Sequence, residues 1–299
     1  MEGQLKKKIL RYKEIYLLLI PVLIYFLVFS YYPLVLGIWK SFQKVKLLGG
    51  YEMVGVENYG EIFRDRQYRQ AFANSLAVGG GTFLLQFVWG LVIALLLNEI
   101  RNKVLKSLVQ TVTYIPYLLS WSVVGGLWIA ILAPSGMGNG ILTAILGDSY
   151  SPVVFMSEGR YARAIMIFTG AWKSAGYFAA LFLAAMVGID GALYESARMD
   201  GASRIQQIRY ITLPVTVPTM KVVAVLSVMG ILRNFDQIFV MMNASISDQV
   251  KNLLVLIYEQ GILQFNVGTA AAAATVVLLA TLMITTAVKK LLKYDEIYS

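Results

Sequence analysis

Polar side chains interrupt two of the long apolar stretches, and they are the first candidates for chemistry. An ionisable group inside a membrane span is costly, so by default it marks a functional position. Amides and carboxylates hydrogen-bond to sugar hydroxyls, and aromatic faces stack on the C–H faces of sugar rings. We therefore predict a polar substrate pathway whose candidate residues are Trp121, Trp172, Lys173, Tyr177, Asn234, Phe235, Asp236 and Gln237.

The same charges have a structural interpretation. Lys173 could pair with Asp236 and hold two helices together. Arg233 stands three residues before Asp236, a spacing at which two side chains of one helix can form an ion pair. The residue types alone leave both interpretations open.

The composition is that of a membrane protein with several spans. Of the 299 residues, 58% are hydrophobic and 14% are charged, whereas soluble domains have about a quarter of their residues charged. Cys and His are absent, which excludes disulfides, Cys/His metal sites and His-based acid–base catalysis. The net charge of +9 fits basic loops beside membrane spans better than a nucleic-acid surface.

Six apolar runs are long enough to cross about 30 Å of hydrocarbon at about 1.5 Å per residue. The first run is too long for the core of a signal peptide and is followed by no small-residue cleavage site, so we expect it to remain as a span. The expected fold is all-α and polytopic, with transmembrane helices at 15–36, 72–97, 108–132, 162–187, 217–242 and 267–288.

The distribution of Lys and Arg predicts the orientation. Fifteen of them lie in the two termini and in segments 98–107 and 188–221, whereas nine lie in the loops of the opposite side. Because basic residues are enriched in cytoplasmic loops, we expect both termini in the cytoplasm.

A polar stretch at 194–214 separates the fourth and fifth runs on the side predicted to be cytoplasmic. Gly201 can adopt the left-handed backbone conformation that ends a helix, and Ser203 can cap a second short helix at 204–210. Pro214 fits the first turn of the next span. The stretch could also be an amphipathic helix that lies on lipid headgroups.

The spacing within this stretch resembles the EAA loop of permeases from binding-protein-dependent ABC importers. It runs Glu195-Ser196-Ala197-x2-Asp200-Gly201-Ala202-x8-Ile211-x-Leu213-Pro214, with Ser196 where the family usually has Ala. In that family the loop forms coupling helices that dock on the ATP-hydrolysing subunit. The resemblance implies polar contacts from Glu195, a turn at 200–202 and a start of the next span at 211–214. The implied coupling residues are Glu195, Ser196, Ala197, Asp200, Gly201, Ala202, Arg204, Ile211, Leu213 and Pro214.

The resemblance extends over the chain. It implies an N-terminal segment with the first span and an external loop (1–69), a five-helix core (70–288) and a cytoplasmic tail (289–299). Three motifs are similar to the subgroup that imports oligosaccharides or polysaccharide fragments, namely 115–121 (IPYLLSW), 172–176 (WKSAG) and 235–239 (FDQIF).

The resemblance also implies the partners. They are a second homologous permease, which would make a heterodimer, cytoplasmic ATP-binding subunits, an extracytoplasmic solute-binding protein and a carbohydrate, at a prokaryotic cell membrane. The chain has no GxxxxGK[ST] motif, so we expect ATP-Mg to bind to the partner, with no cofactor, metal or catalytic residue in this chain and no nucleic-acid partner. An ion-coupled secondary transporter is the alternative. A membrane-embedded enzyme is disfavoured because His, Cys and clustered carboxylates are absent.

Overall fold

The computed structural model describes residues 12–45, 49–147 and 149–294. The basic residues at 6–11 and the last five residues of the predicted tail lie outside this part of the chain. The chain divides into two compact units. Unit 1 comprises Met1–Arg64 and Ile257–Val276, and unit 2 comprises Asp65–Leu256 and Val277–Ser299.

Unit 1 contains the first membrane span and a small folded loop. The span is one apolar helix over Lys13–Lys40, and none of its residues is buried within the chain. Its face is therefore available to lipid or to another subunit. The elements of the unit are α2 (Lys13–Phe26), the π turn η1 (Leu27–Tyr31), α3 (Tyr32–Lys40), β1 (Gln43–Val45), β2 (Tyr51–Met53), α4 (Glu57–Arg64) and the π turn η4 (Glu259–Leu263), followed by the first part of α16 (Val267–Leu291).

The loop after the first span is held by a buried amide. β1 and β2 pair antiparallel, with Lys44 opposite Glu52. The side chain of Asn58 donates hydrogen bonds to the carbonyls of Ser41 at 2.8 Å and Gln43 at 2.9 Å. Glu61 accepts a hydrogen bond from Lys44 and raises the pKa of that lysine. The spans are helical as predicted, and this hairpin is an addition that the apolar pattern did not indicate.

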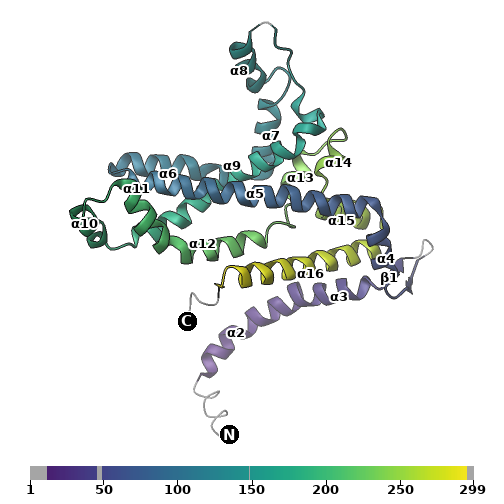
Figure 1. Ribbon diagram of the computed structural model, residues 1–299. Coiled ribbons are helices and arrows are strands. Elements are labelled where there is room, and N and C mark those ends of the chain that lie inside the picture. Colours follow the sequence, from purple (N-terminus) through teal and green to yellow (C-terminus); the bar gives the residue numbers. More distant parts are fainter. Residues whose placement is uncertain (1–11, 46–48, 148, 295–299) are drawn as a thin grey trace. The chain divides into compact units, whose positions relative to one another are not determined.

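Unit 2 contains the middle spans, the second part of the last span and both regions where function was predicted (Figure 1). Its elements are α5 (Arg66–Glu99), α6 (Lys103–Leu118), α7 (Trp121–Ile131), α8 (Met137–Leu146), the 3-10 turn η2 (Phe155–Ser157), α9 (Gly159–Val187), α10 (Gly191–Met199), α11 (Arg204–Gln207), the π turn η3 (Ile208–Thr212), α12 (Leu213–Val228), α13 (Asp236–Met241), α14 (Ser247–Val250) and α15 (Leu253–Tyr258), together with the second part of α16.

The number of spans agrees with the prediction, but two of them are broken. Within the described residues five helices are long and apolar enough to cross a membrane, and the pair α6 and α7, bent by 101°, makes a sixth if it counts as one span. The helix expected at 108–132 is therefore two helices. The helix expected at 217–242 instead extends from Arg204 to Val228, and turns separate it from α13.

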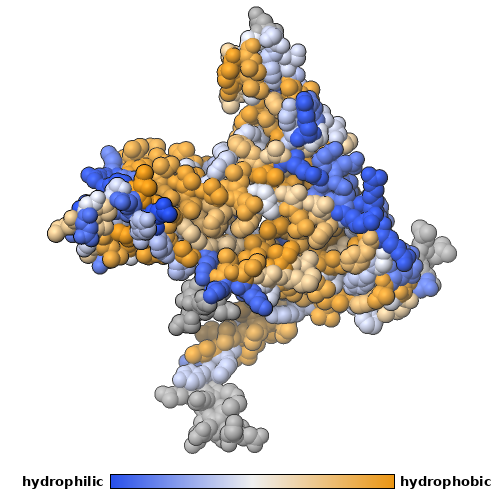
Figure 2. Space-filling model, viewed as in Figure 1, coloured by the Kyte–Doolittle hydropathy of each residue, from blue (hydrophilic) through white to orange (hydrophobic). Residues whose placement is uncertain are grey.

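The centre of unit 2 is the packing of α5 against α9. Phe182 and Met166 of α9 are fully buried, and so is Ala94 of α5. Figure 2 shows hydrophobic side chains along α5 and α6 and hydrophilic ones around the α10–α11 end. This distribution is what a bundle surrounded by hydrocarbon requires, with a polar element at one end.

Candidate functional site

The polar stretch between α9 and α12 is a preorganised turn, which we call the coupling element (residues 190–214). Asp190 caps α10 by accepting a hydrogen bond from the Ala192 N–H at 3.0 Å. The helix ends at Met199, and Gly201, two residues later, has the left-handed conformation that the sequence predicted, with φ +78°. The N–H of Ala202 donates to the carbonyl of Ala197 at 2.8 Å. The N–H of Gly201 donates to the carbonyl of Arg198 at 3.1 Å. Together these two bonds at the C-terminal end of α10 form a Schellman motif, which requires a left-handed residue at the glycine position.

The second half of the coupling element is a helix that runs into the membrane span. Ser203 and Gln206 form a capping box, each accepting a hydrogen bond from the backbone N–H of the other at 3.4 and 2.7 Å. The predicted short helix at 204–210 does not stop there, because η3 joins α11 to α12 without a break. A π turn shifts the hydrogen-bond register just ahead of Pro214, which has no N–H to donate.

The base of the coupling element is tied down, and its outer side chains are exposed. The hydroxyls of Tyr194 and Thr212 hydrogen-bond at 2.9 Å, and Arg204 lies 3.7 Å from Glu99 of α5. The side chain of Glu195 is 75% exposed. The other predicted coupling residues lie on the same element, exposed at Ser196, Asp200, Gly201, Arg204 and Pro214 and half-buried at Ala197, Ala202, Ile211 and Leu213.

Two large apolar side chains belong to the same exposed surface. Met199 is 89% exposed and Ile205 is 77% exposed. Apolar and charged groups together on a rigid frame can dock on another protein.

A second candidate region lies where α6 breaks and turns into α7. Ser120 caps α7, and α9 passes beside the break. Lys173 stands in the middle of α9, fourteen residues from Gly159 and fourteen from Val187. Its ammonium donates a hydrogen bond to the carbonyl of Tyr117 at 2.9 Å, one of the carbonyls that a helix end leaves without a partner.

This arrangement corrects the two ion pairs considered from the sequence. In the part of the chain that the structure describes, Asp236 is in ion-pair distance of neither Lys173 nor Arg233. The reason is that the helix break offers the lysine a backbone carbonyl instead. The ammonium also lies 5.4 Å from the ring centroid of Tyr117 and 5.5 Å from that of Trp121, distances typical of cation–π contacts.

The second break, between α12 and α13, lies at the predicted amide residues. Asn234 lies in the break and Gln237 in the first turn of α13, whereas the sequence predicted one continuous helix over 217–242. Gln237 is fully buried and donates to the Met166 carbonyl at 2.7 Å and to the Thr169 hydroxyl at 2.9 Å. The side chain of Asn234 donates a hydrogen bond to the side-chain oxygen Oε1 of Gln237 at 2.7 Å. The amide pair thus fastens the break to α9.

The two breaks border two cavities that share Trp121. The first, which we call the lysine cavity, has a volume of about 560 Å³ and is lined by Leu119, Ser120, Trp121, Ser122, Lys173, Phe235, Asp236, Phe239 and Val240. The second, which we call the amide cavity, has a volume of about 210 Å³ and is lined by Gly79, Thr82, Phe83, Gln86, Trp121, Gly170, Ser174, Ser227, Gly230, Ile231, Asn234 and Gln237.

Six of the eight predicted pathway residues therefore line a cavity. Trp172 and Tyr177 do not; the first packs edge-on against Trp128 at 5.4 Å and the second stacks on Tyr117 at 4.4 Å. Further polar side chains line the cavities but are not among the predicted pathway residues, namely those of Thr82, Gln86, Ser120, Ser122, Ser174 and Ser227. A Pro at 116 followed by a capping Ser at 120 was the available sign of the first break.

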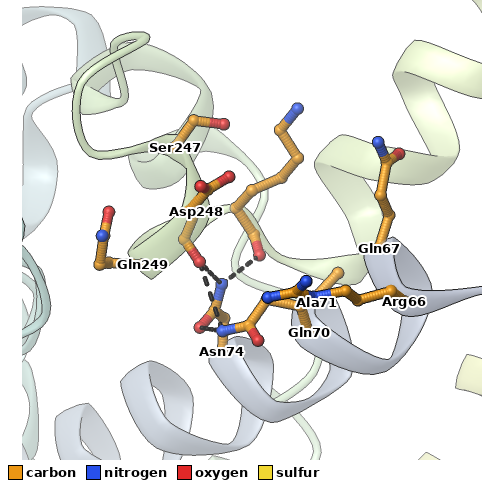
Figure 3. A pocket seen from close by; sticks show the side chains of 9 residues that line it. Arg66, Gln67, Gln70, Ala71, Asn74, Ser247, Asp248 and Gln249 are labelled. Atoms are coloured by element: carbon orange, nitrogen blue, oxygen red, sulfur yellow. Dashed lines mark hydrogen bonds between the residues drawn. The ribbon is translucent and has the colours of Figure 1, made fainter.

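A third polar pocket, of about 440 Å³, lies between the start of α5 and α14, and none of its lining residues was a predicted site residue (Figure 3). The buried Asn74 donates to the carbonyls of Asp248 at 3.0 Å and Lys251 at 2.9 Å. Arg163 of α9 donates to its side-chain oxygen at 2.9 Å. Asn74 thus fixes the segment around α14 to two spans. The pocket is lined by Arg66, Gln67, Gln70, Ala71, Asn74, Ser247, Asp248, Gln249 and Lys251.

The long apolar helices of the described residues are those of a membrane protein with several spans. Residues 86–293 match the family described as the binding-protein-dependent transport system inner membrane component. The chain belongs to this family. It is therefore a transport permease, and its apolar helices cross the membrane several times.

Particular relatives sharpen this class. The chain is 32% identical to Protein LplB of Bacillus subtilis (strain 168), over 85% of this chain and 80% of that protein. It is 30% identical to the polygalacturonan/rhamnogalacturonan transport system permease protein YteP of the same organism, over 95% and 90% of the two chains. A solved bacterial ABC transporter, involved in the import of the acidic polysaccharide alginate, contains a chain that is similar with a TM-score of 0.89 and 32% identity, over 97% of this chain and 98% of that one.

Proposed function

We propose that this chain is the transmembrane permease subunit of an ATP-driven importer that carries an oligosaccharide or polysaccharide fragment across a prokaryotic cell membrane. The observation that carries the proposal is the coupling element, a capped and exposed turn joined without a break to a span. A carrier driven by an ion gradient needs no such docking surface. The named substrates of YteP and of the alginate importer support a carbohydrate.

The continuous helix gives this element a mechanical role. From Arg204 to Val228 it has 25 residues, which corresponds to about 37 Å at 1.5 Å per residue. Ser227, at its far end, lines the amide cavity. When the ATP-binding subunits close on ATP, movement of the docked turn is carried along this helix to the cavity, and the permease changes from inward-open to outward-open.

The partners follow from this mechanism. ATP-Mg binds to cytoplasmic subunits, because the sequence has no phosphate-binding loop. The coupling element faces those subunits, so both termini are cytoplasmic. A second homologous permease completes the pathway beside the cavities, and a solute-binding protein delivers the carbohydrate from outside. A related alginate transporter has been solved together with a pentasaccharide-bound periplasmic protein.

Uptake of labelled oligosaccharides tests the proposal. Proteoliposomes contain this permease, its partner permease and ATPase subunits, with the binding protein outside and ATP inside. We expect uptake that disappears when the ATPase subunits cannot hydrolyse ATP. Uptake that continues with the disabled ATPase and follows a proton or sodium gradient would show the ion-coupled alternative instead.

A further inference from the structure

We propose that Lys173 binds the carboxylate of an acidic sugar in the lysine cavity, so that the imported carbohydrate is a uronate-containing oligosaccharide. This inference rests on the proposed function and names its substrate class. It depends on the surroundings of one ammonium group and on what else lines the same cavity.

The position of Lys173 makes a purely structural role insufficient. The residue is 8% exposed and stands at the centre of a membrane span. Its one hydrogen bond in the described chain goes to the neutral carbonyl of Tyr117, although an ammonium has three N–H donors. The cation–π contacts with Tyr117 and Trp121 compensate the charge in part. They are not a counter-charge, and a buried charge without one is strongly unfavourable, so a neutral donor would satisfy that carbonyl at a lower desolvation cost. A substrate anion that binds beside Lys173 would supply the missing counter-charge, and this explains why a lysine stands at this position.

The lysine cavity has the remaining chemistry for an acidic sugar. Its volume of about 560 Å³ lies within the range of about 300–1,000 Å³ found for small-molecule sites. Trp121 and Phe235 offer ring faces, and Ser120 and Ser122 offer hydroxyls. These groups suit the C–H faces and hydroxyls of the sugar ring, while the ammonium suits its carboxylate.

Asp236 lines the same cavity and would repel an anion placed beside it. Asp236 is exposed, whereas Lys173 is buried, and the two are not within ion-pair distance. The two charges can therefore contact different parts of one sugar. The buried ammonium binds the carboxylate, and the exposed Asp236 accepts hydrogen bonds from hydroxyls. A neutral sugar would use Asp236 but would leave the ammonium without an anion.

The test measures equilibrium binding to the complete importer in nanodiscs, without the binding protein, whose own selectivity would otherwise decide the result. The probes are labelled tetramers of galacturonate and of mannuronate, each paired with its carboxyl-reduced, neutral counterpart. We expect the wild type to bind at least one uronate tetramer about tenfold or more tighter than its neutral counterpart, as a charge-assisted hydrogen bond predicts. Lys173→Met should remove this preference, and Lys173→Arg should keep most of it.

Competition with inorganic phosphate tests whether the cavity binds any simple anion. Phosphate and unlabelled uronate tetramer are each used to displace the labelled uronate tetramer. If both displace it at the same concentration, the cavity is a general anion site and the sugar assignment is wrong. If Lys173→Met and Lys173→Arg lose binding equally, shape matters and charge does not. If Lys173→Met causes loss of the second permease from the purified complex, the ammonium pairs with a carboxylate of that subunit, and the proposal is also wrong.

The wild-type comparison needs no variant and therefore does not depend on whether a variant folds. A wild type that binds neutral tetramers as tightly as uronate tetramers overturns the inference but leaves the importer proposal standing, provided that ATP-dependent uptake of a neutral oligosaccharide is observed. Absence of ATP-dependent uptake for both kinds of sugar would instead contradict the proposed function.

Discussion

The coupling element and the region of broken spans differ in how far apart their partners lie along the chain. In the coupling element the caps join residues two to five positions apart, such as Ser203 with Gln206 and Ala197 with Ala202. In the broken spans, 56 positions separate Lys173 from Tyr117 and 71 separate Gln237 from Met166. One region is built by local rules and the other by packing between distant helices.

This difference has a physical consequence for how the two regions respond to substitution. Local caps act on a short exposed turn, so a change there should alter docking while the bundle stays intact. Polar contacts between distant helices hold the bundle itself together, so a change there should lower the stability of the protein. The following substitutions separate these two kinds of effect.

Gly201→Val should have the largest effect, and the effect should be on coupling. A β-branched residue is strained at φ +78°, with a cost of about 1–3 kcal/mol, although the space around the position is open. The backbone of the turn would take a different path, and the docking surface would therefore change its shape. We expect ATP-dependent uptake to fall about tenfold or more, with ATP hydrolysis continuing in the absence of uptake and membrane levels unchanged.

Gly191→Val is the matched control for that variant. Gly191 begins α10, has no positive φ and has open space around it, so uptake should stay near the wild-type rate. Gly201→Asn should retain more uptake than Gly201→Val, because Asn tolerates the left-handed region. Normal uptake by Gly201→Val would mean that the turn has no role in coupling.

Gly176→Ala should affect the broken spans through stability. A Cβ at this position would lie 2.0 Å from the carbonyl oxygen of Thr113, so α9 and α6 would have to separate. Overpacking of this kind costs about 1–3 kcal/mol and occasionally more. We expect a lower thermal unfolding midpoint for the purified importer. Gly126→Ala, with open space around it, should leave the midpoint unchanged, and equal midpoints for both variants would contradict the close packing.

The contrast also explains which features the sequence predicted. Gly201 and Ser203 follow rules that need only neighbouring residues, and the structure has both features as expected. The spans follow from the length of the apolar runs. The end of α12 at Val228 could not be located in this way, because apolar residues continue after it.

The cavity residues were only partly predictable for the same reason. Asp236 and Lys173 are conspicuous in apolar runs, so the sequence marked them, but it left open whether they pair with each other or line a substrate pathway. Whether they pair depends on a helix break far away in the chain. Ser122 is unremarkable in sequence and lines a cavity only because α7 turns away from α6 by 101°.

Gln237→Met and Gln207→Met form a pair that compares the two regions directly. Both glutamines are buried, at 0% and 3% exposure. The side chain of Gln237 makes three hydrogen bonds, two of them to residues of α9. The side chain of Gln207 donates one hydrogen bond, to the Ala202 carbonyl, and its own oxygen has no partner in the described chain. Removing Gln237 leaves buried groups unsatisfied, at about 1–3 kcal/mol.

Replacing Gln207 should cost less, because the substitution also removes a buried oxygen that has no partner. Thermal unfolding of the purified importer should therefore show a larger decrease for Gln237→Met than for Gln207→Met. Equal decreases would mean that the long-range amide contacts contribute no more to the bundle than the local one does.

Ser203→Ala should have the smallest effect, an increase in local opening that is limited to the coupling element. The substitution removes the cap of α11, which costs about 1 kcal/mol and corresponds to a factor of about five in a local equilibrium. Hydrogen exchange of the amides at 204–207 should become faster by about that factor, while exchange in α9 stays unchanged. Ser196→Ala is the control, because Ser196 lies inside α10 with an exposed side chain, where Ala is at least as good a helix former. If exchange in α9 increased with exchange at 204–207, the turn would not be an independent local unit, and the distinction between the two regions would fail.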